Sequence, residues 1–270
     1  MKLVLGIANF DRSYGLNNHL KKKNTNSILT KVKKKGIYEI DTAINYKKSN
    51  QIISKLNIKN FKINTKLPLI RYSENYKNEI LNQINIFKIK LNINKINILM
   101  FHDRKQIYEK NFEQILNFTK ILKKKKIISG YGFSVYNVNE FLKISELSNP
   151  DVIQIPLNLF DQRFINNKIK KIAKKKKIKL HARSVFLQGL LLNRFVKLND
   201  NKSKKILTEY WNFILDSKCD PLQFNINFLL KQKFIDRFIV SFDNIVQIQR
   251  FYSCLNEKLS SRKINYDLLS

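Results

Sequence analysis

Short apolar runs alternate with longer lysine-rich segments along the whole chain of 270 residues. The runs have the length and the content of β-branched residues that are typical of buried strands, and the segments between them have helical spacing. Strict alternation of strand and helix predicts a parallel sheet with right-handed crossovers. Eight such units in this length predict an α/β fold of the closed (β/α)8 TIM-barrel type rather than an open sheet. The expected strands are residues 2–6, 38–43, 61–67, 96–102, 128–134, 151–158, 179–185 and 237–242.

The domain organisation follows from the even composition of the chain. No low-complexity linker and no change in composition interrupts it, so we expect residues 1–270 to form one barrel domain. The stretch 193–236 is long for a single βα unit. It should therefore contain an extra helix or loop besides a helix around Pro221–Lys233.

The net charge is +32, with an isoelectric point of about 10.1. Such a balance is the expected mark of a nucleic-acid-binding protein. Here, however, the lysines accompany abundant Asn, Ile, Phe and Tyr, with only 6 Gly and 4 Pro. The enriched residues all have A/T-rich codons, so genome-wide base bias explains the charge more simply. We therefore expect no specific nucleic-acid partner.

The compartment is predicted from what the sequence lacks. No apolar run approaches the roughly 20 residues that a membrane-spanning helix needs. The first residues run directly into a strand pattern and are too short for a signal peptide. Two cysteines, Cys219 and Cys254, cannot build a disulfide framework, and their spacing does not resemble a zinc site. We expect a cytoplasmic protein with no membrane association.

Four chemically distinctive residues stand at or just past the ends of three consecutive apolar runs: Asp41, Tyr46, Lys66 and His102. In a barrel of parallel strands these ends meet at one face, where barrel enzymes build their active sites. A tyrosine is a poor acid at its usual pKa of about 10, but a nearby ammonium stabilises the phenolate and a carboxylate holds that ammonium. Lys66 and Asp41 fit those two roles, and an imidazole can orient a carbonyl oxygen.

Each of these residues has a simpler interpretation when taken alone. A single His at a strand end is more often structural than catalytic, and a single Lys or Asp is more often on the surface. Their grouping at three successive strand ends favours a functional site. For His181, which shares a strand face with Arg183, a role in the core is the better interpretation.

Residues 2 to about 250 resemble the aldo-keto reductase family. The matching motifs are Asp41–Tyr46, Thr65–Pro68, Leu99–Asp103, Gly132–Asn137, Gln154–Asn158 and Arg183–Leu191. The sequence begins directly at the first expected strand, with Lys2–Gly6, and lacks the hairpin that usually precedes this strand in the family. This short N-terminal segment and Tyr14–Asn18 resemble a bacterial subgroup whose genes often lie beside genes for cell-surface polysaccharides and nucleotide sugars.

The resemblance implies an oxidoreductase that transfers hydride between a nicotinamide and the carbonyl of an aldehyde or ketone, with no metal. Tyr46 would donate the proton, Lys66 and Asp41 would tune Tyr46, and His102 would position the carbonyl. NADPH is the family default, and NADH is the alternative. The implied cofactor-binding residues are Ser134, Gln154, Arg183, Ser184, Leu187, Gly189, Ser241, Asp243, Asn244, Gln247 and Arg250. The substrate would be a small carbonyl compound, with a sugar derivative as one candidate, and the protein would be a monomer or homodimer.

The sequence also departs from the family pattern. Val135 stands in place of an Asn, Ser241 in place of a Gly, Asn50 in place of a Glu, and Arg250-Phe251 in place of Glu-Asn. Arg183 replaces an aromatic residue that commonly stacks on the nicotinamide, and a planar guanidinium can also stack. These changes motivate a second hypothesis, a barrel that binds cofactor in a regulatory role but has lost turnover. A basic nucleic-acid-binding protein is the third.

Overall fold

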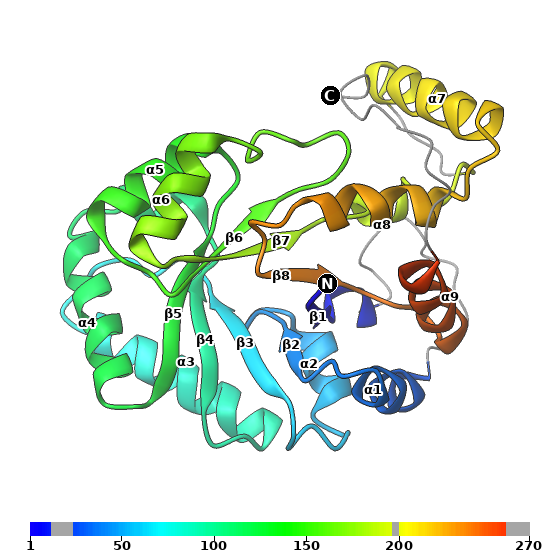
Figure 1. The fold of residues 1–270 in the computed structure, drawn as a ribbon. Helices are drawn as coiled ribbons and strands as arrows, with labels where there is room; N and C mark the ends of the chain where they lie inside the picture. The colour runs from blue at the N-terminus through cyan, green and yellow to red at the C-terminus, as the bar shows by residue number, and fades with distance from the viewer. Residues whose placement is uncertain (12–23, 196–199, 258–270) are drawn as a thin grey trace.

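The computed structural model describes residues 1–11, 24–195 and 200–257. Eight parallel strands form a closed barrel in sequence order, and β1 pairs with β8 to complete it (Figure 1). The predicted (β/α)8 barrel is confirmed, and each strand lies within or close to its expected range. The strands are β1 (Leu3–Gly6), β2 (Glu39–Asp41), β3 (Lys62–Leu67), β4 (Ile96–Phe101), β5 (Ile128–Ser134), β6 (Val152–Pro156), β7 (Lys179–Arg183) and β8 (Arg237–Val240).

Helices surround the barrel on its outer side (Figure 1). They are α1 (Thr25–Lys34), α2 (Lys47–Ile53), α3 (Tyr76–Leu91), α4 (Phe112–Lys124), α5 (Val138–Leu147), α6 (Asn167–Lys176), α7 (Asn201–Asp216), α8 (Pro221–Lys231) and α9 (Ile245–Asn256), with three short 3-10 turns η1 (Ala8–Phe10), η2 (Arg104–Tyr108) and η3 (Leu187–Gly189). Both α7 and α8 lie between β7 and β8, so the extra helix expected in residues 193–236 is present. In Figure 1, α7 lies farther from the strands than α8 does.

Local sequence signals explain where several helices begin and end. The Asn24 side chain accepts a hydrogen bond from the backbone N–H of Ser27, at 3.1 Å, and caps α1. Gly36 follows that helix with a φ of 80°, which glycine adopts without a steric penalty. Helix α8 begins with Pro221 behind an Asp220 cap. These devices satisfy helix-end groups that otherwise have no partner within the helix.

The main apolar core lies between the barrel and its helices. Phe101 on β4 and Phe133 on β5 pack at a ring-centroid distance of 5.1 Å, and Phe112 of α4 contacts Phe101 at 5.6 Å. All three rings are buried. Burial of each such side chain stabilises the fold by about 1.5–3 kcal/mol. Inside the barrel, Gly132 has no room for a side chain, because a Cβ there would overlap the carbonyl oxygen of Val152.

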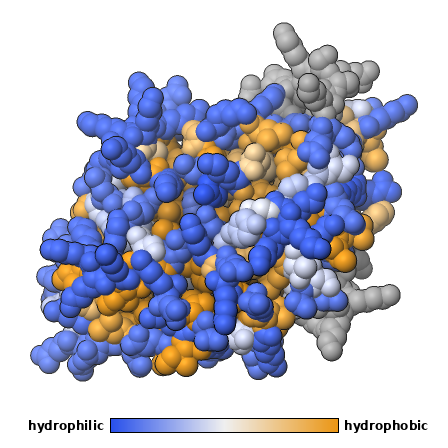
Figure 2. All heavy atoms as spheres, turned by 60° about the horizontal axis from the view of Figure 1, so that its bottom comes forward, coloured by the Kyte–Doolittle hydropathy of each residue, from blue (hydrophilic) through white to orange (hydrophobic). Residues whose placement is uncertain are grey.

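The basic residues are distributed around the barrel. Helices α1, α3, α4, α6 and α8 each carry lysine in their last turn, where positive charge interacts favourably with the helix dipole. Hydrophilic residues are spread over the whole face seen in Figure 2, with apolar residues between them. This distribution does not favour one concentrated surface for a polyanion. Within the described ranges, no helix combines the length and apolar character needed to cross a membrane.

Candidate active site

A buried ion pair joins the ends of β2 and β3. The Lys66 ammonium donates to Asp41 Oδ2 at 2.5 Å and to the carbonyl oxygen of Thr42 at 3.0 Å. Lys66 and Asp41 are 3% and 7% exposed. The side-chain amide of Gln154, on β6 across the barrel, donates to the other Asp41 oxygen. The carboxylate therefore receives a donor on each oxygen, which is what a charge removed from water requires.

Opposing effects act on the pKa of Lys66. Burial lowers the pKa of Lys66 from its usual value of 10.5, while the charge and hydrogen bond of Asp41 act in the opposite direction. The charge of Arg183 lowers the pKa of Lys66 further. Such competition between desolvation and a charge partner is common at catalytic sites.

Tyr46 lies at the start of α2, in the loop that follows β2. Asn50 fixes this loop, since its side chain accepts from the Thr42 hydroxyl at 2.8 Å and donates to the carbonyl of Ala43 at 2.8 Å. Asn50 is buried. The amide that departs from the family pattern thus holds the segment that carries the tyrosine.

His102 directly follows β4 and meets Tyr46 edge to face, with ring centroids 6.0 Å apart. Burial, and next the charge of Lys66, lower the pKa of His102 from 6.5 to about 4. The imidazole is therefore neutral near pH 7, so one ring nitrogen can donate a hydrogen bond and the other can accept one. The four residues predicted at the strand ends thus lie together.

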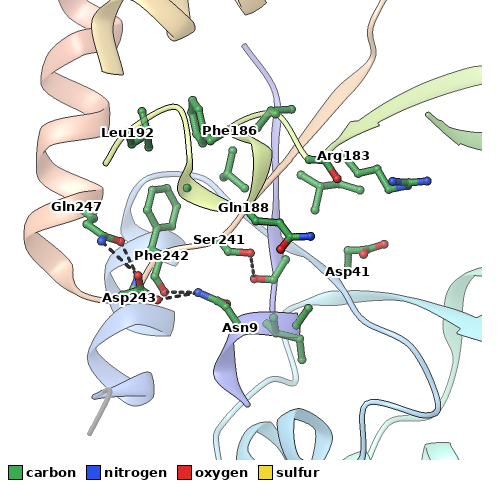
Figure 3. A pocket seen from close by; sticks show the side chains of 18 of the residues that line it. Asn9, Asp41, Arg183, Phe186, Gln188, Leu192, Ser241, Phe242, Asp243 and Gln247 are labelled. Carbon is green, nitrogen blue, oxygen red and sulfur yellow. Dashed lines mark hydrogen bonds between the residues drawn. The ribbon is translucent and has the colours of Figure 1, made fainter. Parts of the chain in front are cut away.

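These four residues line a cavity of about 490 Å³ at the carboxyl ends of the strands. Figure 3 shows Arg183 and Asp41 toward one end and Asp243 and Gln247 toward the other. Nine of the eleven predicted cofactor-binding residues also line it: Ser134, Gln154, Arg183, Ser184, Gly189, Ser241, Asp243, Gln247 and Arg250. The side chain of Leu187 instead packs against the core, and Asn244 caps α9 by accepting from the N–H of Gln247.

Arg183 projects from the end of β7 and is held on two sides. Its Nη2 donates to the carbonyl oxygen of Val135 at 2.9 Å, and its guanidinium lies 4.4 Å from the ring centroid of Tyr136. Val135, another departure from the family pattern, therefore helps to hold Arg183 through its backbone carbonyl. Sequence reasoning gave Tyr136 no role, although it stands inside a quoted motif two residues after Ser134.

The loop after β7 has an unusual backbone. Ser184, Leu187, Gln188 and Gly189 all have positive φ angles, of 57°, 48°, 55° and 95°. Residues other than glycine adopt this conformation at a cost, and several of them close together are typical of loops that hold a ligand. The loop also brings Phe186 to the cavity wall, a residue to which the sequence analysis gave no role.

Contacts between distant segments close the opposite end of the cavity. The side-chain amide of Asn9, after β1, donates to Asp243 Oδ1 at 2.9 Å, and Gln247 accepts from the Asp243 N–H at 2.7 Å (Figure 3). The Ser241 hydroxyl donates to the carbonyl of Gly6 at 2.8 Å. Serine in place of the family's glycine is thus accommodated at the β1–β8 seam. Arg250 forms an ion pair with the Asp220 carboxylate.

The model of the Aldo/keto reductase family matches residues 2–266 of the sequence. The chain belongs to the aldo/keto reductase family. It is accordingly an NAD(P)H-dependent oxidoreductase of the class that reduces carbonyl groups, as the motifs predicted. The Tyr14–Asn18 segment, which suggested a bacterial subgroup, lies outside the described residues.

Solved structures of other aldo-keto reductases share the fold. The aldo-keto reductase AKR11C1 from Bacillus halodurans, in its holo form, superposes with a TM-score of 0.75 at 16% identity, covering 100% of this chain and 92% of that one. The glycerol dehydrogenase AKR11B4 from Gluconobacter oxydans gives 0.69 at 20% identity, covering 96% and 87%. A comparison with curated proteins finds no match.

The residues of this aldo/keto reductase fit a nicotinamide dinucleotide. The cavity volume lies within the range of about 300–1,000 Å³ that is usual for ligand sites. Gln154 Oε1 and Arg183 Nε are buried polar atoms without a hydrogen-bond partner in the described part of the chain. Unsatisfied groups of this kind are expected where a ligand completes the site. Among the same residues, no cluster of His, Cys, Asp or Glu is arranged to hold a metal ion.

Proposed function

We propose that this aldo/keto reductase converts an aldehyde or ketone to an alcohol, with Tyr46 as the proton donor. The observation that carries the proposal is the buried Lys66–Asp41 pair beside a tyrosine and a neutral imidazole in one cavity. Each turnover consumes NAD(P)H, a proton and the carbonyl compound, and yields NAD(P)⁺ and the alcohol. The cofactor supplies the hydride.

The protein residues manage the proton and the orientation of the substrate. Tyr46 gives its hydroxyl proton to the developing alkoxide, and the Lys66 ammonium stabilises the phenolate that remains. Asp41 and Gln154 fix the lysine in place through the carboxylate. His102, neutral because its pKa is lowered to about 4, donates a hydrogen bond to the carbonyl oxygen.

Binding of the nicotinamide end is assigned to residues on β5, β6 and β7. Ser134 and the unsatisfied oxygen of Gln154 would hold the carboxamide, and the guanidinium of Arg183 would lie against the ring. The loop with Ser184 and Gly189 would face the pyrophosphate. Asp243, Gln247 and Arg250 would meet the adenosine end, where NADPH is the family default and NADH is the alternative.

The substrate class is narrowed by analogy. The subgroup resemblance favours a sugar derivative, and a structural neighbour is a glycerol dehydrogenase, which suggests a small polyhydroxylated compound. Asn193, at the cavity wall, offers a polar side chain for hydroxyls. A cytoplasmic location and a monomeric or homodimeric state complete the proposal.

The substitution Tyr46→Phe tests the role of the proton donor. It should lower kcat/KM by about 10²–10⁴-fold, the usual contribution of a general acid, while the cofactor dissociation constant stays nearly unchanged. Tyr136→Phe is the matched control, because it removes a hydroxyl from the same cavity and should retain turnover. Equal turnover of Tyr46→Phe and wild type would reject Tyr46 as the acid.

A cofactor-binding barrel without turnover is the alternative, and it was motivated by the departures from the family pattern. The side chains of Asn50 and Ser241 each make specific contacts in this fold, which weakens that motivation. Fluorescence titration with NADPH and with NADH tests, without a known substrate, the cofactor cavity that both hypotheses require, and NAD(P)H oxidation in the presence of a panel of carbonyl compounds then separates the two hypotheses. Micromolar binding supports a working cavity, and the absence of binding by folded protein would contradict the proposed function.

A further inference from the structure

The charges around Asp41, Tyr46, Lys66 and His102 do not cancel. Among the described charged residues that line this end of the cavity, Lys66 and Arg183 are cationic and Asp41 is anionic. Asp41 pairs with Lys66 at 2.5 Å. Arg183 forms no ion pair with a described carboxylate, and its contacts are instead a backbone carbonyl and the ring of Tyr136. One positive charge therefore remains uncompensated where the nicotinamide is expected.

The charge of Arg183 reaches the groups around it. It contributes to the lowered pKa of both Lys66 and His102, after the larger effect of burial in each case. For His102, the charge of Lys66 acts in the same direction, whereas Asp41 and Asp103 oppose it. A potential that disfavours an imidazolium also disfavours any other cation at this place.

The guanidinium is also held in position. The Val135 carbonyl and the Tyr136 ring, 4.4 Å from it, fix its plane. Its Nε, buried and without a described hydrogen-bond partner, marks it as incompletely satisfied by the protein. A planar, weakly hydrated cation with one face on an aromatic ring can place its other face against a second flat ring.

We propose that Arg183 makes the cavity bind NAD(P)H more tightly than NAD(P)⁺, so that the reduced cofactor is loaded in preference and the oxidised cofactor is released readily. The inference rests on the proposed function. When hydride leaves NAD(P)H for the carbonyl carbon and a proton reaches its oxygen, the neutral dihydronicotinamide becomes a cationic ring. Only this oxidised ring is repelled by Arg183, whereas the phosphates and sugars are common to both forms.

The test is a measurement of both dissociation constants. NADH or NADPH is titrated by fluorescence, and NAD⁺ or NADP⁺ is measured by competition against it. Wild type should bind the reduced form at least about tenfold more tightly, and Arg183→Gln should lower this ratio by about tenfold, as expected for one partly screened charge. For a two-electron couple that loss equals about 30 mV in the potential of the bound cofactor.

Two further variants test whether the ratio of the dissociation constants depends on the charge of Arg183, on the shape of its side chain or on its position in the cavity. Arg183→Lys keeps the charge and should retain most of the ratio. Arg250→Gln removes the other arginine of the cavity at the opposite end, so any weakening should affect both forms equally.

Two results would overturn the inference while leaving the proposed function standing. One is equal affinity of wild type for the two forms, and the other is an unchanged ratio in Arg183→Gln. Failure of the folded wild type to bind either form would instead refute the proposed function and, with it, this inference.

Discussion

His181 should make the stability of this protein sensitive to acid. It lies in the middle of β7, beside Gln154 on β6, is 3% exposed and does not line the cavity, which agrees with the core role expected for it. Burial, and next the charges of Arg237, Lys179 and Lys66, lower the pKa of His181 from 6.5 to about 3. The folded protein therefore keeps this imidazole neutral at pH values where an unfolded chain protonates it.

The sign and size of the effect follow from proton linkage. Below pH 6.5 the unfolded state binds more protons than the folded state, so folding stability is lost as the pH falls from 6.5 toward 3. Each pH unit well inside this window costs about 1.4 kcal/mol, so the step from about pH 7.5 to about pH 4.5 costs about 2.5 kcal/mol. His102, whose pKa is lowered to about 4, acts in the same direction, but it is partly exposed and should contribute less.

Urea unfolding of wild type and His181→Gln at the two pH values measures this contribution. Glutamine keeps a polar side chain but does not titrate, so the variant should lose about 2.5 kcal/mol less than wild type between about pH 7.5 and about pH 4.5. All other titrating groups are common to both proteins and cancel in the difference. An identical pH dependence for the two proteins would show that folding does not lower the pKa of His181, and the reasoning would then be wrong.

Three further substitutions test the packing and the ion pair. Lys66→Met leaves the Asp41 charge buried without its partner, and should lower the free energy of unfolding in denaturant by about 3–5 kcal/mol as well as abolish turnover. Gly132→Ala forces a Cβ onto a backbone carbonyl of β6 and should lower the free energy of unfolding by about 3 kcal/mol or more. The control Gly36→Ala, whose Cβ meets open space, should lower it by about 1 kcal/mol. Equal melting temperatures of the two variants would contradict this expectation. Asn50→Ala removes the side chain that fixes the Tyr46 loop and should lower kcat more than it changes cofactor affinity, so an unaltered kcat would count against that positioning role.

The fold was predictable because its signals are local and repeated. Every expected strand is present, but several are shorter than their apolar runs. The run 151–158 contains β6 only from Val152 to Pro156, and the run 237–242 contains β8 only to Val240. Apolar character continues past the last strand residue, because single loop residues such as Leu157 and Phe242 are also buried. Periodicity therefore located the strands better than it located their ends.

Part of the site was also predictable from sequence. Parallel strands of a closed barrel place their carboxyl ends at one face, so residues at those ends must converge. The convergence of Asp41, Lys66 and His102 follows from this rule and from their places in the sequence alone. The rule could not assign Tyr136 or Asn9, whose partners, Arg183 and Asp243, are distant in sequence.

The sequence by itself determined the alternation of strand and helix, the helix ends marked by Asn24 and Gly36, and the four reactive side chains at the strand ends. Only the tertiary structure decided how those side chains are charged and held. The amide of Gln154 reaches Asp41 across 113 positions, and the neutral state of His102 depends on burial and on Lys66. Such contacts and potentials arise when the barrel closes, because closure excludes water and brings distant strands together, and no local pattern of residues encodes either.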